Sequence, residues 1–265
     1  VFEQGHGIGR QAGDEAPGGV MHIQQGGHGG EGGRVQRVQG GQPGLRARRR
    51  GLRPDRRRKG QGQREAEKEG FHPIQAVVRG FDRPHYYPGR KESALKVIAD
   101  KETGRILGGQ AVGEGPSDKF IDILAMALHG KMICRELAPV DLAYAPPYSP
   151  VLSPVIVAAN VLMNKLEGRI EGIQASEVRE KLRTSKEKFQ VLDVREEDEV
   201  KAKRISGTTW IPYGELKKRL GELDKKKEIA VHCESGLRSY KACLKLQHEG
   251  FENVKNVDGG MLCWC

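Results

Sequence analysis

The feature that most constrains the fold of this 265-residue chain is an apolar segment that leads directly into a cysteine loop. Residues 228–232 (Glu-Ile-Ala-Val-His) predict a buried strand, residues 233–239 form a short loop, and a helical pattern follows. Two further apolar runs, at 189–194 and 254–257, predict more strands. Strands that alternate with helices are typical of a parallel sheet covered by helices. The C-terminal part is therefore expected to be an α/β domain.

Cys233 occupies the position in this arrangement where chemistry is expected. It lies at the carboxyl end of a strand and before a helix, where open α/β sheets bind their ligands. Backbone N–H groups of the loop and the positive end of the helix dipole favour a thiolate, the nucleophilic form of cysteine. Arg238 can bond an anion or brace the loop, whereas His232 points to the opposite face and is not expected to be the general base. The alternative is that Cys233 is only a small buried hydrophobe.

Four motifs in this part of the chain occur in the order found in rhodanese domains. They are Leu-Asp-Val-Arg-Glu at 192–196, the cysteine loop at 233–239, Gly-Phe-Glu-Asn-Val at 250–254 and Asp-Gly-Gly-Met at 258–261. Residues 173–265 therefore resemble a rhodanese, an α/β sulfurtransferase domain. The resemblance implies that Cys233 carries sulfane sulfur as a persulfide, taken from a polysulfide, a persulfide or thiosulfate and passed to a thiol or cyanide. It also implies that the rest of the loop binds substrate, namely Glu234, Ser235, Gly236, Leu237, Arg238 and Ser239.

One departure from the rhodanese pattern has a chemical consequence. Glu234 follows the cysteine at a position where a basic residue is common. Its carboxylate opposes thiolate formation and repels dianionic thiosulfate, an effect of about 1 kcal/mol at partial exposure. We therefore expect a preference for persulfide or polysulfide donors over thiosulfate. Residues 204–207 read Arg-Ile-Ser-Gly where many rhodaneses have His-Ile-Pro-Gly, so a structural polar contact is expected to differ there.

Residues 71–168 show a different pattern, in which strands are grouped before helices. Runs of β-forming residues at 95–99 and 105–112 flank a polar turn that contains Gly104, which predicts a β-hairpin. Apolar residues at helical spacing follow from residue 117, and a second helix is expected over about 154–166. This order predicts an α+β domain with an antiparallel or mixed sheet and helices packed on it.

Two tyrosine-rich loops complete the pattern of this middle part, His-Tyr-Tyr-Pro-Gly at 85–89 and Ala-Tyr-Ala-Pro-Pro-Tyr-Ser-Pro at 143–150. Together with the hairpin and the helix order, they make residues 71–168 resemble the dimerisation domain of FAD-dependent pyridine nucleotide–disulfide oxidoreductases. The most similar subgroup contains CoA-disulfide reductases, NADH oxidases and persulfide reductases. The resemblance implies a homodimer formed through 71–168. In this homodimer, the phenols of Tyr86, Tyr87 and Tyr144 would reach the redox-active cysteine of the partner subunit. A phenol there stabilises a thiolate or supplies a proton.

The cofactors of that family are not expected to bind this chain. The complete enzymes are flavoproteins that use FAD and NAD(P)H, with CoA as a candidate substrate, and no flavin or nicotinamide domain is recognisable in this sequence. Gly5, Gly7 and Gly9 lack the spacing and the strand–helix context of a dinucleotide-binding loop. We therefore expect no cofactor and no metal, and we interpret the chain as a C-terminal fragment in which flavin-dependent reduction does not run.

Residues 1–70 are interpreted as a disordered segment rich in glycine and arginine. They contain 19 of the 36 glycines and contribute +6 of the net charge of +10, with almost no aromatic or β-branched residues. Such a composition cannot bury enough apolar surface to offset the entropy of ordering. One alternative is that the arginines bind nucleic acid, although aromatic residues for base stacking are missing. Another is that a frameshift before about residue 70 scrambled the upstream sequence.

The cysteines and the apolar runs indicate a cytoplasmic chain without membrane spans. The five cysteines are irregularly spaced, no charged-then-apolar leader opens the chain, and the longest apolar run covers only 155–163. Cys263 and Cys265 flank Trp264, which is too little for a metal site, although a resolving-thiol role stays open for one of them.

The function expected from the sequence is a persulfide or thiosulfate sulfurtransferase attached to the dimerisation domain of a reductase. Its partners are small sulfane-sulfur donors, thiol acceptors and a second copy of the chain, and neither a membrane nor nucleic acid is expected among them. The alternatives are a catalytically inactive dimerisation or binding fragment and a basic N-terminal arm that binds nucleic acid.

Overall fold

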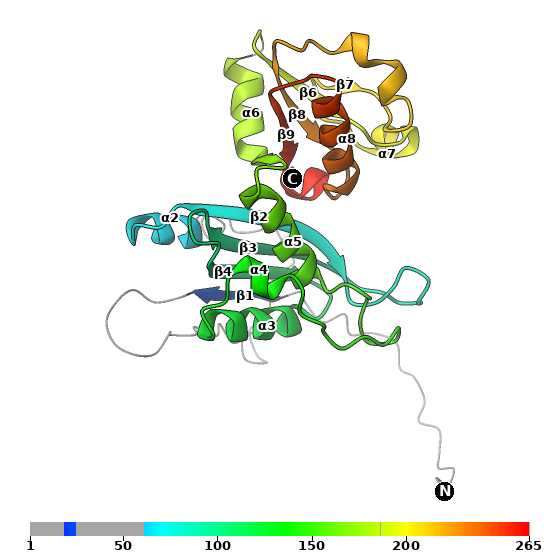
Figure 1. Cartoon of the computed structure of the whole chain (residues 1–265). Helices are drawn as coiled ribbons and strands as arrows, with labels where there is room; N and C mark the ends of the chain where they lie inside the picture. Colours follow the sequence, from blue (N-terminus) through cyan, green and yellow to red (C-terminus); the bar gives the residue numbers. More distant parts are fainter. Residues whose placement is uncertain (1–18, 25–60, 186, 265) are drawn as a thin grey trace, which may run out of the picture.

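The computed structural model describes residues 19–24, 61–185 and 187–264 and arranges them in two successive domains (Figure 1). Residues 1–18 and 25–60, which make up most of the segment interpreted as disordered, basic or frameshifted, lie outside the described residues. Within that segment the structure has strand β1 (Gly19–Gln24) and helix α2 (Gln61–Lys68). Residues 61–68, part of the segment interpreted as disordered, are thus helical, and the packing of this helix on the sheet accounts for it.

The first domain is built on an antiparallel sheet with the strand order β1-β4-β3-β2. The predicted hairpin is formed by β3 (Glu92–Asp100) and β4 (Ile106–Gly113), and β2 (Pro73–Phe81) pairs with β3 at the edge. Three helices follow the strands: α3 (Ser117–His129), α4 (Cys134–Leu137) and α5 (Pro154–Leu166). The sequence prediction of an α+β domain is thus confirmed.

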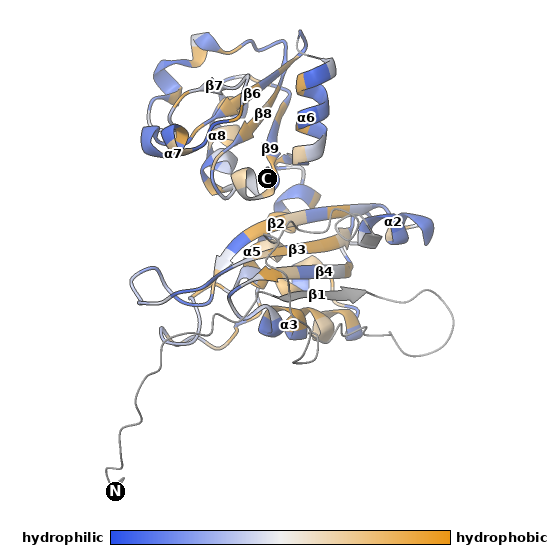
Figure 2. Ribbon diagram, turned by 180° about the vertical axis from the view of Figure 1, so that it is seen from behind, coloured by the Kyte–Doolittle hydropathy of each residue, from blue (hydrophilic) through white to orange (hydrophobic). Residues whose placement is uncertain are grey.

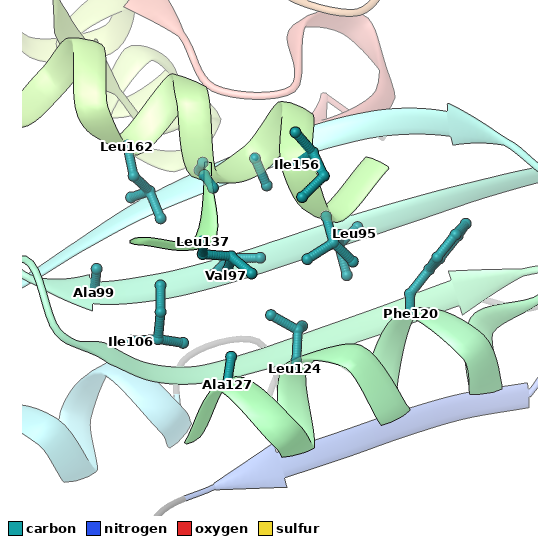
Figure 3. Packing of buried hydrophobic residues seen from close by; sticks show 14 of the residues in the cluster. Leu95, Val97, Ala99, Ile106, Phe120, Leu124, Ala127, Leu137, Ile156 and Leu162 are labelled. Carbon is teal, nitrogen blue, oxygen red and sulfur yellow. The ribbon is translucent and has the colours of Figure 1, made fainter. Parts of the chain in front are cut away.

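These three helices pack on one face of the sheet. Because side chains alternate along a strand, every second residue of β3 points to this core. The helix α5 contributes its most apolar positions, as expected from a helix that is apolar on most sides. The core residues labelled in Figure 3 are Leu95, Val97, Ala99, Ile106, Phe120, Leu124, Ala127, Leu137, Ile156 and Leu162.

Helix α2 covers the opposite face. Ala66 packs there with Ile98 of β3 and Leu107 of β4, whose side chains alternate away from the main core. The sequence of α2 is mostly polar, and Ala66 is buried. The contact with the sheet, which composition does not reveal, accounts for the order of this helix.

The second domain is a parallel sheet with the strand order β5-β9-β8-β6-β7, covered by helices on both faces. The predicted α/β class is confirmed, and Figure 2 shows mostly hydrophobic strands beneath largely hydrophilic α6 and α7. Strand β5 begins at Glu171, two residues before the segment that resembles a rhodanese. The strands are β5 (Glu171–Ile173), β6 (Phe189–Asp193), β7 (Thr209–Trp210), β8 (Glu228–His232) and β9 (Val254–Val257). The helices are α6 (Ala175–Thr184), α7 (Glu197–Ala202), α8 (Leu237–His248) and the 3-10 turns η1 (Leu216–Lys218), η2 (Leu220–Glu222) and η3 (Gly260–Cys263).

Strand β8 is the central strand of this sheet, and Cys233 follows it directly. Ile229 and Val231 belong to the core beneath α8, whereas Ala230 belongs to the core beneath α6. Burial on both faces explains why the strand is a continuous apolar run in the sequence. In the part of the chain that the structure describes, no helix combines the length and the apolar character that crossing a membrane requires.

Candidate functional site

The sulfur of Cys233 accepts two hydrogen bonds inside the loop between β8 and α8. The backbone N–H of Gly236 lies 3.1 Å from Sγ, and the hydroxyl of Ser239 lies 3.4 Å from it. Cys233 is 1% exposed and Ser239 is fully buried. The sulfur therefore lies at the N-terminus of α8 with two donors directed at it, an arrangement that stabilises negative charge on sulfur.

The path of the loop depends on glycine at two positions. Gly236 has φ +100° and ψ −14°, and its carbonyl accepts hydrogen bonds from the hydroxyl of Ser239 at 3.1 Å and from Nδ2 of Asn256 at 3.3 Å. Gly260 has φ +55°, and a Cβ there would lie 2.3 Å from the carbonyl oxygen of Cys233. The Asp-Gly-Gly-Met motif at 258–261 is thus required by the close approach of η3 to the cysteine loop.

Arg238 is held by an acidic residue that the sequence analysis did not single out. Its guanidinium bonds both carboxylate oxygens of Glu199 in α7, at 2.6 and 2.5 Å. The hydrogen bonds from Arg238 are the main reason why the pKa of Glu199 is lowered, and the same contact raises the pKa of Arg238. Of the two roles expected for Arg238, the structure assigns it a bracing contact between α8 and α7. The spacing of Glu196 and Glu199, typical of a capping box, was the available signal.

Glu234 lies between two arginines rather than facing solvent alone. Its carboxylate is 3.3 Å from Arg79 of β2 and 3.6 Å from Arg195, and its side chain is 39% exposed. Ser235 is half-buried and Leu237 is exposed. The loop residues predicted from the sequence are therefore gathered around Cys233, and Arg79, from the first domain, is an addition that no local pattern indicates.

His232 is buried beside the Asp193 carboxylate at the end of β6. It is 1% exposed, and its Nε2 is 3.6 Å from Oδ2 of Asp193. Burial lowers the pKa of His232 to about 4, although the nearby Asp193 carboxylate acts in the opposite direction. The imidazole is therefore neutral at neutral pH.

The tyrosines predicted for a site in trans belong to the first domain and are not brought to Cys233. The hydroxyls of Tyr86 and Tyr144 lie 3.5 Å apart, and these residues are 62% and 49% exposed. Hydrogen bonding to Tyr144 raises the pKa of Tyr86. Tyr87 is half-buried beneath the guanidinium of Arg83.

The remaining cysteines and acidic residues form no metal site that the structure describes. Within the described residues, no group of three or more histidine, cysteine, aspartate or glutamate side chains could hold a metal ion. Cys263 is half-buried, and Cys265 lies outside the described residues.

Comparison with known families decides the identity of both domains. Residues 174–265 match the model of the rhodanese-like domain, and residues 58–155 match the dimerisation domain of the pyridine nucleotide-disulphide oxidoreductases. The putative sulfurtransferase YtwF of Bacillus subtilis is 37% identical over 92 residues, which are 35% of this chain and 87% of YtwF. The chain belongs to the rhodanese family through its second domain. Both resemblances predicted from the sequence are confirmed.

Longer relatives match one domain of this chain or more than one. The CoA-dependent NAD(P)H sulfur oxidoreductase of Pyrococcus abyssi is 45% identical over 84 residues, which are 32% of this chain and 19% of that protein. The NAD-dependent persulfide reductase of A. fulgidus superposes with a TM-score of 0.68 at 42% identity, over 77% of this chain and 36% of that structure. That coverage exceeds either domain alone. The rhodanese chain thus spans about a fifth of the first relative and little more than a third of the second.

Proposed function

We propose that Cys233 of the rhodanese domain accepts sulfane sulfur, holds it as a persulfide and passes it to a thiol. The observation that carries this proposal is the pair of hydrogen bonds to Sγ, from the Gly236 N–H and the Ser239 hydroxyl, at the start of α8. Both donors favour the thiolate that attacks the donor sulfur, and both remain in reach of the persulfide that results.

The transfer consists of two displacements at sulfur. In the first, the Cys233 thiolate attacks the outer sulfur of a persulfide R–S–S⁻ and the S–S bond of the donor breaks. The outer sulfur stays on Cys233 as Cys–S–S⁻, and the thiolate R–S⁻ leaves and takes up a proton from solvent. In the second, an acceptor thiolate attacks the outer sulfur on Cys233, and the Cys233 thiolate is the leaving group. No net electrons are exchanged in the pair of steps, so the rhodanese domain needs no cofactor of its own.

The charges around the loop favour donors of low charge. Arg238 is already paired with Glu199, and Glu234 adds a further carboxylate beside the nucleophile. Arg79 and Arg195 offset part of the Glu234 charge, which weakens but does not reverse the expectation from the sequence. We therefore retain persulfides and polysulfides as the preferred donors and thiosulfate as the poorer one.

The proposal for the first domain is that it pairs two copies of the chain. Tyr86 and Tyr144 project from exposed loops, as residues that act in a partner subunit must. FAD, NAD(P)H and CoA belong to this proposal only through the longer parent enzyme. The loop between β8 and α8, where an open α/β sheet would bind a dinucleotide, directs its Gly236 N–H at the sulfur of Cys233 instead.

Mass spectrometry of the intact chain tests the sulfur-carrying role. After treatment with polysulfide, a mass increase of roughly 32 Da, one sulfur atom, is expected on the peptide that contains Cys233. Cys233→Ser must lose the adduct, while Cys263→Ser, which changes a half-buried cysteine in the same domain, must keep it. An unmodified Cys233 peptide in the wild-type chain would support the alternative of a non-catalytic dimerisation or binding module.

Steady-state rates with polysulfide and thiosulfate test the donor class. The wild-type chain is expected to use polysulfide better, and Glu234→Ala is expected to raise the rate with thiosulfate about 3- to 10-fold more than the rate with polysulfide. A thiosulfate preference that persists in Glu234→Ala contradicts the proposed donor class.

A further inference from the structure

A row of alternating charges crosses the junction between the two domains and passes beside the nucleophile. Arg79 bonds Glu92 at 2.5 Å within the first domain and Glu234 at 3.3 Å across the junction. Glu234 in turn lies 3.6 Å from Arg195. Arg195 ends the row in a buried pair with Asp193, at 2.8 Å. The row thus joins the edge of one sheet to the carboxyl end of a strand in the other.

The edge strand β2 supplies the first-domain side of this junction, and Figure 1 shows it as the strand nearest to the rhodanese domain. A Cβ on Gly259 would lie 3.0 Å from Val77, two residues before Arg79. Residues two apart on a strand share a face, so Val77 and Arg79 meet the rhodanese domain together. At the end of α5, Nζ of Lys165 bonds the Asp258 carboxylate at 2.6 Å and the carbonyl of Gln75 in β2, also at 2.6 Å.

Arg195, the second arginine near Glu234, is paired mainly with Asp193. Arg195 is almost fully buried and directs Nε and Nη2 to the carboxylate of Asp193. Its Nη1 and Nη2 also donate to the backbone carbonyls of Glu199 and Lys203. Asp193 therefore balances most of the positive charge of the Arg195 guanidinium, and little of it is left to offset Glu234. Arg79 is shared between Glu92 and Glu234, but it approaches Glu234 more closely than Arg195 does, at 3.3 Å compared with 3.6 Å.

We propose that Arg79 is a positioning residue for the cysteine loop: by pairing with Glu234 across the domain junction it offsets the carboxylate next to Cys233 and keeps the loop against β2. The role goes beyond sulfur carrying, because it sets the reactivity of Cys233 toward any electrophile. Docking of the rhodanese domain on β2 is then part of what activates the nucleophile. The charged and titratable groups that face the loop are Arg79 from β2, Asp193 and Arg195 from the end of β6, Glu196 and Glu199 from α7, His232 from β8, Glu234 from the loop, and Arg238 and Cys243 from α8.

Alkylation of the full chain by iodoacetamide, followed by peptide mapping, measures this reactivity at Cys233 alone. In Arg79→Met the alkylation rate at pH 7 is expected to fall about 3- to 10-fold, and the midpoint of its pH profile to move upward by about 0.5 to 1 pH unit. Arg79→Lys, which retains the charge, is expected to stay within about 2-fold of wild type.

A second substitution separates the charge effect from damage to the loop. Glu234→Gln removes the carboxylate that Arg79 offsets, so Arg79→Met combined with Glu234→Gln must recover a pH profile close to that of wild type. Arg83→Met is the matched control. Arg83 is also paired with an aspartate of its own loop, at 2.8 Å, and its side chain is 27% exposed compared with 26% for Arg79.

The results distinguish this inference from the proposed function. An unchanged pH profile in Arg79→Met, or a slowing that Glu234→Gln fails to correct, overturns the positioning role. Because alkylation requires no sulfur donor, a chain that behaves as expected here but gains no sulfur from polysulfide refutes the sulfur-carrying role alone.

Discussion

The two domains present their reactive groups in opposite ways. Cys233 is 1% exposed and receives its hydrogen bonds from residues three and six positions further along the same chain. Tyr86 and Tyr144 are 62% and 49% exposed, and each has the other as its hydrogen-bond partner. The rhodanese site is thus assembled from one short loop. The tyrosine pair instead has the exposure expected of groups that act in a site of a partner subunit.

This difference follows from the kind of sheet in each domain. In the parallel sheet, the carboxyl end of the central strand β8 and the start of α8 converge on one point, so consecutive residues form an enclosed site. In the antiparallel domain, the two tyrosines lie on loops far apart in the sequence, at 82–91 and 138–153, and both side chains stay exposed. Substitutions at the domain junction and within each domain test this difference.

The largest effect is expected from Lys165→Met, which leaves Asp258 without its cation at the junction. Lys165 and Asp258 have side chains that are 10% and 7% exposed. Burial raises the pKa of Asp258 even though Lys165 opposes that shift. Breaking such a buried pair costs about 3–5 kcal/mol, and we expect this loss in the docking of the two domains.

Urea unfolding measures this loss, because both tryptophans, Trp210 and Trp264, lie in the rhodanese domain and their fluorescence reports on that domain. Limited proteolysis of the segment between α5 and β5 should accelerate in parallel. Lys201→Met is the control, since its pair with Glu197 is exposed and is worth about 1 kcal/mol or less. Equal effects of the two substitutions would show that the junction does not depend on Lys165.

A smaller effect is expected from His232 as the pH falls. Its pKa is ordinarily 6.5 and is lowered to about 4 by burial in the folded chain. Between these values the unfolded chain binds the extra proton and the folded chain does not, so stability is lost as the pH falls through this window. The full loss is about 3 kcal/mol at the lower end.

Unfolding free energies measured between pH 7 and pH 4 test this prediction. His232→Gln should lower the slope of stability against pH in that window, whereas His85→Gln, which changes an exposed loop histidine, should leave the slope as it is. An unchanged slope in His232→Gln would mean that His232 is not the group that titrates.

The smallest effect is expected from substitution of the tyrosines, which tests whether the two sites are independent. Tyr86→Phe and Tyr144→Phe are expected to leave sulfur loading of Cys233 within about 2-fold of wild type, because both phenols lie outside the cysteine loop. The Tyr144→Phe variant should also lower the pKa of Tyr86, which hydrogen bonding to Tyr144 raises. Ultraviolet titration of the phenols measures that shift. A large loss of sulfur loading would show that the two sites are coupled.

Local patterns predicted the elements correctly where the buried segments are strongly apolar in the sequence. The helix over 154–166 and the strand at 228–232 are both strongly apolar, and both have the predicted bounds. Helix α2 was missed because its order depends on Ala66 meeting Ile98 and Leu107 across the sheet. A polar stretch with one buried alanine has no period that would reveal such a contact.

The sequence by itself determined the arrangement around the sulfur of Cys233, because the strand, the loop and the helix that hold it are consecutive residues. Only the tertiary structure decided which charges surround it. Arg79 and Glu234 are separated by 155 positions, and their contact depends on how β2 and the rhodanese domain pack together. Pairing at such a distance is set by the geometry of the domain junction, which neither composition nor periodicity encodes.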